Sequence, residues 1–306
     1  MASLRSNTAK MAYKHRFLYV MFFPIALYYI VFNYIPLIMG AAMSFQDFKI
    51  GNSVFTAKWV GFGNYVKIFQ NRALVTSIKN TLEISGLKML FGFFPPIILA
   101  ICLFDMSSRF FKRVSQTILY IPHFFSWVIV YGIFFAFFST GSGVINQIVE
   151  FFTGGRINFF LHGGWFRFLL IFSSVWKTIG WGSILYLAAL TAVNTELFEA
   201  AKIDGCGPFK RVWYITFPSI LPIVGFVLTL NIGTILMSDF EQILMFYNTQ
   251  VYDVADVIAT WVYREGLSKM KYSLGAAISI LNGGVSVLLI AAGNGLSRRI
   301  SGRGIW

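Results

Sequence analysis

The stretch Glu199–Pro218, EAAKIDGCGPFKRVWYITFP, is a polar segment between two long apolar runs. Just before it, Thr195 is placed to cap a first helix. Gly205 can adopt the left-handed conformation that closes that helix. Pro208 can start a second helix without losing a hydrogen bond, and Pro218 limits it. The pattern predicts a compact helix-turn-helix that docks on another protein. The alternative, on composition alone, is an amphipathic loop lying on a bilayer.

The order and spacing of these residues resemble the EAA coupling loop of ABC importer permeases, and in particular of the maltose-permease-like carbohydrate-uptake family. The matching pattern is Glu-Ala-Ala, two residues, Asp-Gly, and then Ile-x-x-Pro. Cys206 and Phe217 stand where that family commonly has Ala and Leu. The resemblance implies that the loop lies in a groove of an ATPase subunit and moves with it. The coupling residues of this chain would then be Glu199, Ala200, Ala201, Asp204, Gly205, Gly207, Phe209, Ile215 and Pro218.

The composition of the whole chain indicates a polytopic membrane protein. Of its 306 residues, 57% are hydrophobic and only 12% are charged, whereas soluble domains are about 25% charged. The formal net charge is +13, but Lys and Arg flank apolar runs and form no stripe, so nucleic-acid binding is not expected. Runs of the length that a membrane helix needs lie at about 17–45, 81–104, 117–138, 168–192, 220–247 and 273–292.

These runs predict an all-α membrane protein with six transmembrane helices. The resemblance makes it a type I, maltose-permease-like ABC importer permease with a cytoplasmic coupling helix. We expect an N-terminal segment (1–16), a six-span permease domain (17–293) that includes the coupling loop (195–218), and a basic tail (294–306). Lys and Arg are nearly balanced between the two sets of loops, so the positive-inside rule gives only a weak orientation. The resemblance places the coupling loop and both termini in the cytoplasm of a bacterial cell. An amphipathic piece is expected at Val144–Phe152 in the loop after the third span.

Further segments are similar to one subgroup, the LplB-type permeases, which import complex oligosaccharides from plant, algal or host glycans. One is the segment KWVGFGNY after the first span, which resembles the VG-x-x-NY segment of sugar permeases. The others lie near the end of the chain, at Ser238–Ile243, Tyr252–Ile258 and Val262–Leu267. The resemblance covers nearly the whole chain. It implies oligosaccharide import through the bacterial cell membrane.

No enzyme signature is present in the sequence. There is no phosphate-binding Gly-x-x-x-x-Gly-Lys-Ser/Thr segment, and the three histidines lack metal-site spacing. We therefore expect no enzyme, no metal and no cofactor in this chain, with ATP and Mg²⁺ bound by partner ATPase subunits. The resemblance implies a heterodimer with a second permease, two cytoplasmic ATPase subunits and an extracellular sugar-binding lipoprotein. The alternative is a secondary sugar carrier driven by an ion gradient, with Lys177, Asp239 and Glu241 as its coupling charges.

A sugar path across a membrane needs polar side chains that face the interior of the bundle. The fourth and fifth spans each carry such a stripe at helical spacing. In maltose-type permeases the helices before and after the coupling loop line the sugar site. The predicted path residues are Ser174, Lys177, Thr178, Trp181, Asn231, Thr234, Ile235, Ser238, Asp239 and Glu241.

Each of these side chains has an alternative role. Ser and Thr in membrane helices often bond their own backbone, and Trp181 can serve packing alone. Lys177 is a substrate contact, a partner for an acid of the companion permease, or a residue that snorkels to the interface. Lys88 is a similar but more isolated case. Asp239 and Glu241 contact the sugar or the binding protein, or they are interfacial charges.

Overall fold

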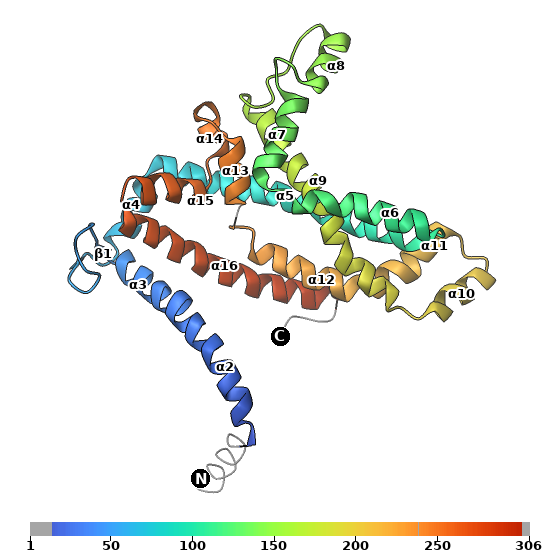
Figure 1. Ribbon diagram of the computed structural model, residues 1–306, viewed down its shortest axis with the longest axis horizontal. Coiled ribbons are helices and arrows are strands. Elements are labelled where there is room, and N and C mark those ends of the chain that lie inside the picture. Colours follow the sequence, from blue (N-terminus) through green and yellow to red (C-terminus); the bar gives the residue numbers. More distant parts are fainter. Residues whose placement is uncertain (1–13, 238, 302–306) are drawn as a thin grey trace. The chain divides into compact units, whose positions relative to one another are not determined.

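The computed structural model describes residues 14–237 and 239–301, and most of these residues are helical (Figure 1). Five helices are long and apolar enough to cross a membrane, and the number is six if one bent pair is a single span. This agrees with the predicted six-span protein. The chain divides into two units, residues 1–68 with 265–280 and residues 69–264 with 281–306.

The first unit contains the first predicted span. Three consecutive helical segments make one long apolar helix, and none of its membrane-spanning window is buried within the described structure. Pro24 and Pro36 lie inside it. An apolar helix exposed on all sides suits a lipid or protein environment, not water. The segments are α2 (Arg16–Tyr29), the π-helical η1 (Ile30–Tyr34) and α3 (Ile35–Ser44).

Asn64, from the segment KWVGFGNY, holds the end of this helix. Its side chain is 4% exposed and donates hydrogen bonds to the carbonyls of Ser44 and Gln46, each at 2.9 Å. The segment therefore has a structural role in this unit. The surrounding elements are β1 (Gln46–Asp47), which pairs antiparallel with β2 (Lys58–Trp59), α4 (Gly63–Gln70), the end of η5 (Val262–Ser268) and the start of α16 (Tyr272–Ser301).

The second unit is built around the pair α5 and α9, which pack against each other. One apolar core lies among α5, α9 and α12, and a second joins α7 and α9 to the segment from α13 to α15. Its elements are α5 (Arg72–Asp105), α6 (Arg109–Tyr120), η2 (Ile121–Phe124), α7 (Trp127–Phe138), α8 (Val144–Thr153), α9 (Gly163–Thr191), α10 (Thr195–Ile203), α11 (Pro208–Arg211), η3 (Val212–Thr216), α12 (Phe217–Gly233), α13 (Phe240–Phe246), η4 (Thr249–Val251), α14 (Tyr252–Ala255), α15 (Ile258–Trp261) and the remainder of α16.

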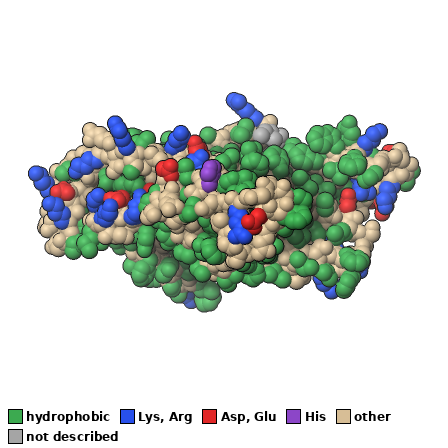
Figure 2. Space-filling model, turned by 90° about the horizontal axis from the view of Figure 1, so that it is seen from above, with side chains coloured by type: hydrophobic (Ala, Val, Ile, Leu, Met, Phe, Trp, Pro, Cys, Tyr) green, Lys and Arg blue, Asp and Glu red, His purple; other side chains and the backbone are tan. Residues whose placement is uncertain are grey.

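Apolar side chains cover much of the surface. Figure 2 shows them over a large part of one face, and many large hydrophobic residues are more than half exposed, including Phe94, Ile98 and Leu288. Such exposure is unusual for a soluble monomer and is expected of a protein whose solvent is a bilayer. The predicted amphipathic piece at 144–152 is the helix α8.

Two of the predicted spans differ from the structure. The third is not one helix over 117–138, because α6 with η2 and then α7 meet at a bend of 105°. Pro122 lies in η2, and Ser126 caps the new helix by accepting a hydrogen bond from the Ile129 N–H. The polar residues of IPHFFSW therefore end one helix and start another.

The fifth span ends at Gly233 and does not continue to Tyr247. Thr234 leaves the helical conformation, and α13 forms separately after Asp239. The end of α12 lies close against α16, where a Cβ at Gly233 would overlap the side chain of Ile290. The predicted polar stripe along a single fifth helix is therefore interrupted, and its last members lie on the following segment.

Helix α6 lies close against α9 at Gly180, where a Cβ would overlap the carbonyl of Leu119. Gly180→Ala should therefore lower the stability of the purified protein in detergent by about 1–3 kcal/mol, the usual range for overpacking. Gly86→Ala on α5 is the matched control, because nothing lies within 4 Å of its added Cβ. Thermal unfolding of both variants tests the contact. Equal melting temperatures would contradict it.

Candidate functional site

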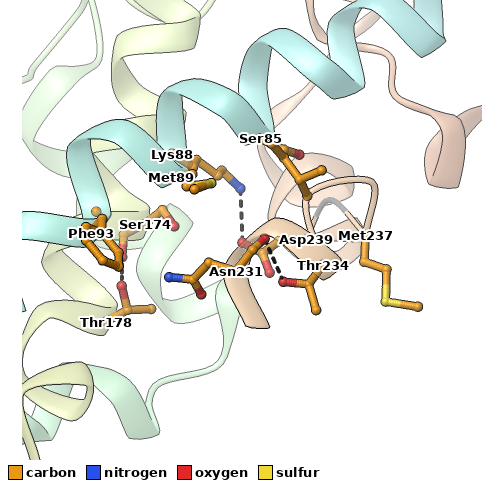
Figure 3. Close-up of a pocket in the computed structure, with 12 residues that line it drawn as sticks. Ser85, Lys88, Met89, Phe93, Ser174, Thr178, Asn231, Thr234, Met237 and Asp239 are labelled. Carbon is orange, nitrogen blue, oxygen red and sulfur yellow. Dashed lines mark hydrogen bonds and ion pairs between the residues drawn. The ribbon is translucent and has the colours of Figure 1, made fainter. Parts of the chain in front are cut away.

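A cavity of about 230 Å³ opens among α5, α9, α12 and the segment after α12 (Figure 3). Its lining is mixed, with hydroxyl, amide and charged groups beside apolar side chains. Such a mixture suits a polar ligand with apolar faces. The lining residues are Ser85, Lys88, Met89, Gly92, Phe93, Ser174, Thr178, Asn231, Thr234, Ile235, Met237 and Asp239.

Six predicted path residues line this cavity: Ser174, Thr178, Asn231, Thr234, Ile235 and Asp239. The cavity thus brings together parts of the fourth and fifth predicted spans. Lys177, Trp181 and Glu241 are not among its lining residues, and Ser238 lies outside the described residues. Two of the hydroxyl groups also bond backbone, since Thr178 donates to the Ser174 carbonyl at 2.8 Å and Thr234 to that of Leu230 at 3.2 Å.

Helix α5 forms one wall of the cavity, which the predicted path did not include. It contributes Ser85, Lys88, Met89, Gly92 and Phe93. The signal for this wall is present in the sequence, because Ser85 and Lys88 lie one turn apart within the apolar run 81–104. Two polar side chains on the same face of a membrane helix point to a functional surface.

Lys88 is the centre of a charged network in the cavity. Its ammonium group lies 3.0 Å from the Asp239 carboxylate and also donates a hydrogen bond to the side-chain oxygen of Gln242. The Gln242 amide donates to the Leu170 carbonyl at 2.7 Å and to the Ser173 hydroxyl at 2.8 Å. The network therefore links α5, α9 and α13. It also satisfies a charge that would be costly to leave unpaired inside a membrane.

Lys177 and Trp181 have a structural role beside the broken third span. The Lys177 ammonium donates a hydrogen bond of 2.6 Å to the His123 carbonyl, at the end of η2. The Trp181 ring stacks on the His123 ring, with centroids 4.3 Å apart and planes 2° from parallel. Lys177 thus contacts a helix end, where a cation is favoured. Its place in the substrate path stays a prediction.

A second buried network fixes the segment that follows α13. The Asp256 carboxylate, on a residue 4% exposed, accepts hydrogen bonds from Ser77 at 3.0 Å and Thr260 at 2.8 Å. Arg264 binds it with both terminal nitrogens, at 3.0 and 2.7 Å. This carboxylate raises the pKa of Arg264 above its ordinary value. Asn80 on α5 donates to the Asp256 carbonyl at 3.1 Å. The segment is therefore tied to the start of α5.

The first half of the coupling loop forms the predicted helix, α10. Its cap is Asn194, whose side chain accepts a hydrogen bond from the Glu196 N–H at 3.0 Å, so the prediction of Thr195 as the cap was wrong. Asn194 is the stronger capping type, and its position makes Thr195 the first helical residue. Gly205 has a φ of 69°, the left-handed conformation that the sequence predicts at the end of the helix.

The second half of the loop is not a separate short helix. Helix α11 starts at Pro208 as predicted, but it continues through η3 into α12, so that Pro208–Gly233 is one membrane-length helix. Pro218 lies in the first turn of α12, where it does not end the helix. Arg211 binds Asp105 at the end of α5, at 3.0 Å. The loop is therefore joined to α5 by this ion pair and to α12 by the continuous helix, and both helices are walls of the cavity.

The surface of the loop is strongly apolar. Ile203 is 86% exposed and Phe209 is 90% exposed. Trp213 and Tyr214 are also exposed, and both lie on the helix that leads into the membrane. Glu199 and Asp204 are exposed nearby. Large exposed apolar side chains with charged neighbours are typical of a protein docking surface.

Several known proteins are similar to this chain over nearly its whole length. It is 36% identical over 293 residues to the polygalacturonan/rhamnogalacturonan transport system permease protein YteP of Bacillus subtilis, covering 96% of this chain and 91% of YteP. Protein LplB of the same organism is also 36% identical, with 96% and 92% covered. Among solved structures, a chain of a bacterial alginate ABC transporter, in complex with an alginate pentasaccharide-bound periplasmic protein, superposes with a TM-score of 0.89 at 36% identity. It covers 97% of this chain and 99% of that one.

The helices, the cavity and the exposed loop together define a membrane permease. Residues 92–302 match the family described as binding-protein-dependent transport system inner membrane component, and the chain belongs to that family. It is a multi-pass permease subunit of an ABC importer, as predicted, and not an enzyme. The relatives are transport permeases that match nearly the whole chain, which supports the ABC importer permease over the secondary carrier considered from the sequence.

The network around Asp256 yields a stability prediction. Asp256→Asn removes the charge that both terminal nitrogens of Arg264 bind and should destabilise the purified protein by about 2–3 kcal/mol, because breaking a partly buried ion pair is costly. Asp253→Asn, an exposed neighbour, is the control and should have little effect. Thermal unfolding and limited proteolysis of residues 247–264 measure the difference. Unchanged cleavage in Asp256→Asn would show that this network does not hold the segment.

Proposed function

We propose that this chain forms half of the translocation path of an ATP-driven importer of oligosaccharides. The observation that carries the proposal is the cavity between α5, α9 and α12. It combines hydroxyl and amide groups with Met89 and Phe93, which suits the polar edges and apolar faces of a pyranose ring. The names of the similar transporters give polygalacturonan/rhamnogalacturonan and alginate, so a glycan is the class of ligand that fits both observations.

The substrate path would run past the cavity residues, with Asn231, Thr234 and Ser174 as hydrogen-bonding groups for sugar hydroxyls. Ile235 would supply an apolar contact and Thr178 a further hydroxyl. Asp239 would contact the sugar in the same cavity. Glu241 and Ser238 would belong to the path through the segment that follows α12. In this proposal Lys177 and Trp181 position the bend between η2 and α7 and do not touch the sugar.

The coupling loop would connect this path to ATP hydrolysis. Its proposed contacts with an ATPase subunit are made by Glu199, Ala200, Asp204 and the turn at Gly205 and Gly207. Phe209 would insert into an apolar groove of that subunit, while Ala201, Ile215 and Pro218 hold the loop in shape. ATP and Mg²⁺ would be bound by two such cytoplasmic subunits, because this chain has no phosphate-binding loop.

The complete importer would contain a second, related permease and an extracellular sugar-binding lipoprotein. Both termini of this chain would be cytoplasmic, together with the coupling loop. The segments 1–16 and 294–306 would flank a permease domain at 17–293. Closure of the ATPase subunits on ATP would move the loop, and through it α12 and α5, so that the cavity opens to one side of the membrane at a time.

Reconstitution tests the function directly. The chain is expressed with its companion permease, ATPase and binding protein, placed in proteoliposomes, and supplied with labelled oligosaccharides. We expect uptake that requires ATP hydrolysis and the binding protein. Uptake that continues with a hydrolysis-deficient ATPase, or that needs only this chain, would contradict the proposal.

The apolar surface of the loop yields a second test. Phe209→Ser should remove the central apolar contact and reduce co-purification of the ATPase by about tenfold or more, since a buried aromatic anchor contributes at least ~2 kcal/mol. Phe151→Ser on α8, where the ring is 84% exposed, is the matched control and should leave co-purification unchanged. An equal yield of ATPase with both variants would contradict docking at Phe209.

A further inference from the structure

Helix α5 places two hydrogen-bond donors at the cavity, the Ser85 hydroxyl and the Lys88 ammonium group. Among the described residues, only Lys88 has side-chain partners that accept from it. Ser85 is 8% exposed, and its hydroxyl has no hydrogen-bond partner among the residues that the structure describes. Lys88 lies one turn further along and also lines the cavity. A buried hydroxyl without a partner is unfavourable, so the geometry points to a ligand atom that accepts from Ser85 beside the ammonium group.

The partner of Lys88 is held much less firmly than Lys88 itself. The Lys88 side chain is 11% exposed, whereas that of Asp239 is 49% exposed. Gln242 is fully buried and is fixed by its bonds to α9, so it keeps its oxygen directed at Lys88. The Lys88 ammonium group therefore has one fixed neutral acceptor, Gln242, and one carboxylate, Asp239, that can turn away because its side chain is half exposed.

Asp239 has an alternative position close at hand. It is the N-cap residue of α13, yet its side chain makes no capping hydrogen bond to the described backbone of that helix. Asp is among the preferred capping residues, and its carboxylate is stabilised by the free N–H groups of a first turn. Rotation of the Asp239 side chain from Lys88 to the N-terminus of α13 would thus exchange one set of charge-assisted hydrogen bonds for another.

We propose that Lys88 and Ser85 form a carboxylate-binding subsite and that Asp239 occupies it until the substrate arrives. A carboxylate on the incoming glycan takes the place of Asp239 on the ammonium group and accepts from Ser85, and Asp239 turns to cap α13. The inference rests on the proposed function and gives its substrate class, an acidic, uronate-bearing oligosaccharide. The remaining lining is uncharged, so Lys88 alone distinguishes such a glycan from a neutral one.

The test uses the assembled transporter in nanodiscs and direct binding measurements. The probes are trisaccharides of galacturonic, glucuronic and mannuronic acid, each paired with its carboxyl-reduced, neutral counterpart. We expect at least one acidic probe to bind more tightly than its neutral counterpart by about tenfold, the effect of one charge-assisted hydrogen bond. If every neutral probe binds as tightly as its acidic counterpart, or more tightly, the carboxylate subsite at Lys88 is overturned while the proposed function stands. Binding of no probe at all contradicts both this assignment and the proposed function.

Three variants separate a carboxylate site from a purely structural ion pair. Lys88→Gln should weaken the acidic probe by about tenfold and change the neutral one less than twofold. Asp239→Asn should tighten the acidic probe, because the competing carboxylate is gone. The double variant should bind both probes alike. A structural pair predicts a different pattern, in which Lys88→Gln and Asp239→Asn weaken both probes to the same extent, and that pattern would overturn the proposal. Melting temperatures identify variants that fail to fold. If the charge variants fail, the test uses Ser85→Ala, which keeps both charges and should weaken binding of the acidic probe only.

Discussion

The structure depends on the rule that a polar group within a membrane must find a partner inside the protein. Gln242 shows this most clearly, because its amide bonds α9 while its oxygen accepts from Lys88 on α5. These hydrogen bonds fix the position of α13 and, with it, the interruption between the helices α12 and α13. The break places Asp239 at the cavity instead of on a continuous helix. The hydrogen bonds of Gln242 thus tie α13 to α5 and α9 next to the Lys88–Asp239 ion pair.

Helix α5 connects the functional regions of the second unit. Its end at Asp105 binds Arg211 of the coupling loop, its middle carries Lys88 at the cavity, and its start holds the segment after α13 through Ser77 and Asn80. A helix of 34 residues with contacts at three levels can carry a displacement from one end toward the other. The loop at 195–218 and the cavity are therefore connected by the continuous helices α5 and α12 and by the Arg211–Asp105 ion pair.

The sequence was sufficient for the class of fold, because long apolar runs and the EAA spacing are local patterns. It also identified six cavity residues, since the resemblance points to the helices beside the loop. It did not indicate the breaks at Phe125 and Thr234, because membrane composition makes both halves of each run look like one helix. The hydrogen bond of Lys177 to the His123 carbonyl was also inaccessible, since the two residues are 54 positions apart. Lys88 was visible as a charge in an apolar run. Its partners Asp239 and Gln242 could not be predicted, because they follow the helix break at Thr234, which the pattern of apolar residues does not show.

The central claim is that the cavity between α5, α9 and α12 is the sugar path. Thr178→Cys, in a background where Cys102 and Cys206 are replaced by serine, places one reactive thiol at this cavity. The rate of its modification by a hydrophilic thiol reagent is then measured in the assembled transporter, with and without saturating oligosaccharide. We expect ready modification that the sugar slows and that abolishes uptake. A thiol that reacts at the same rate with bound sugar, and whose modification leaves uptake intact, would contradict the claim.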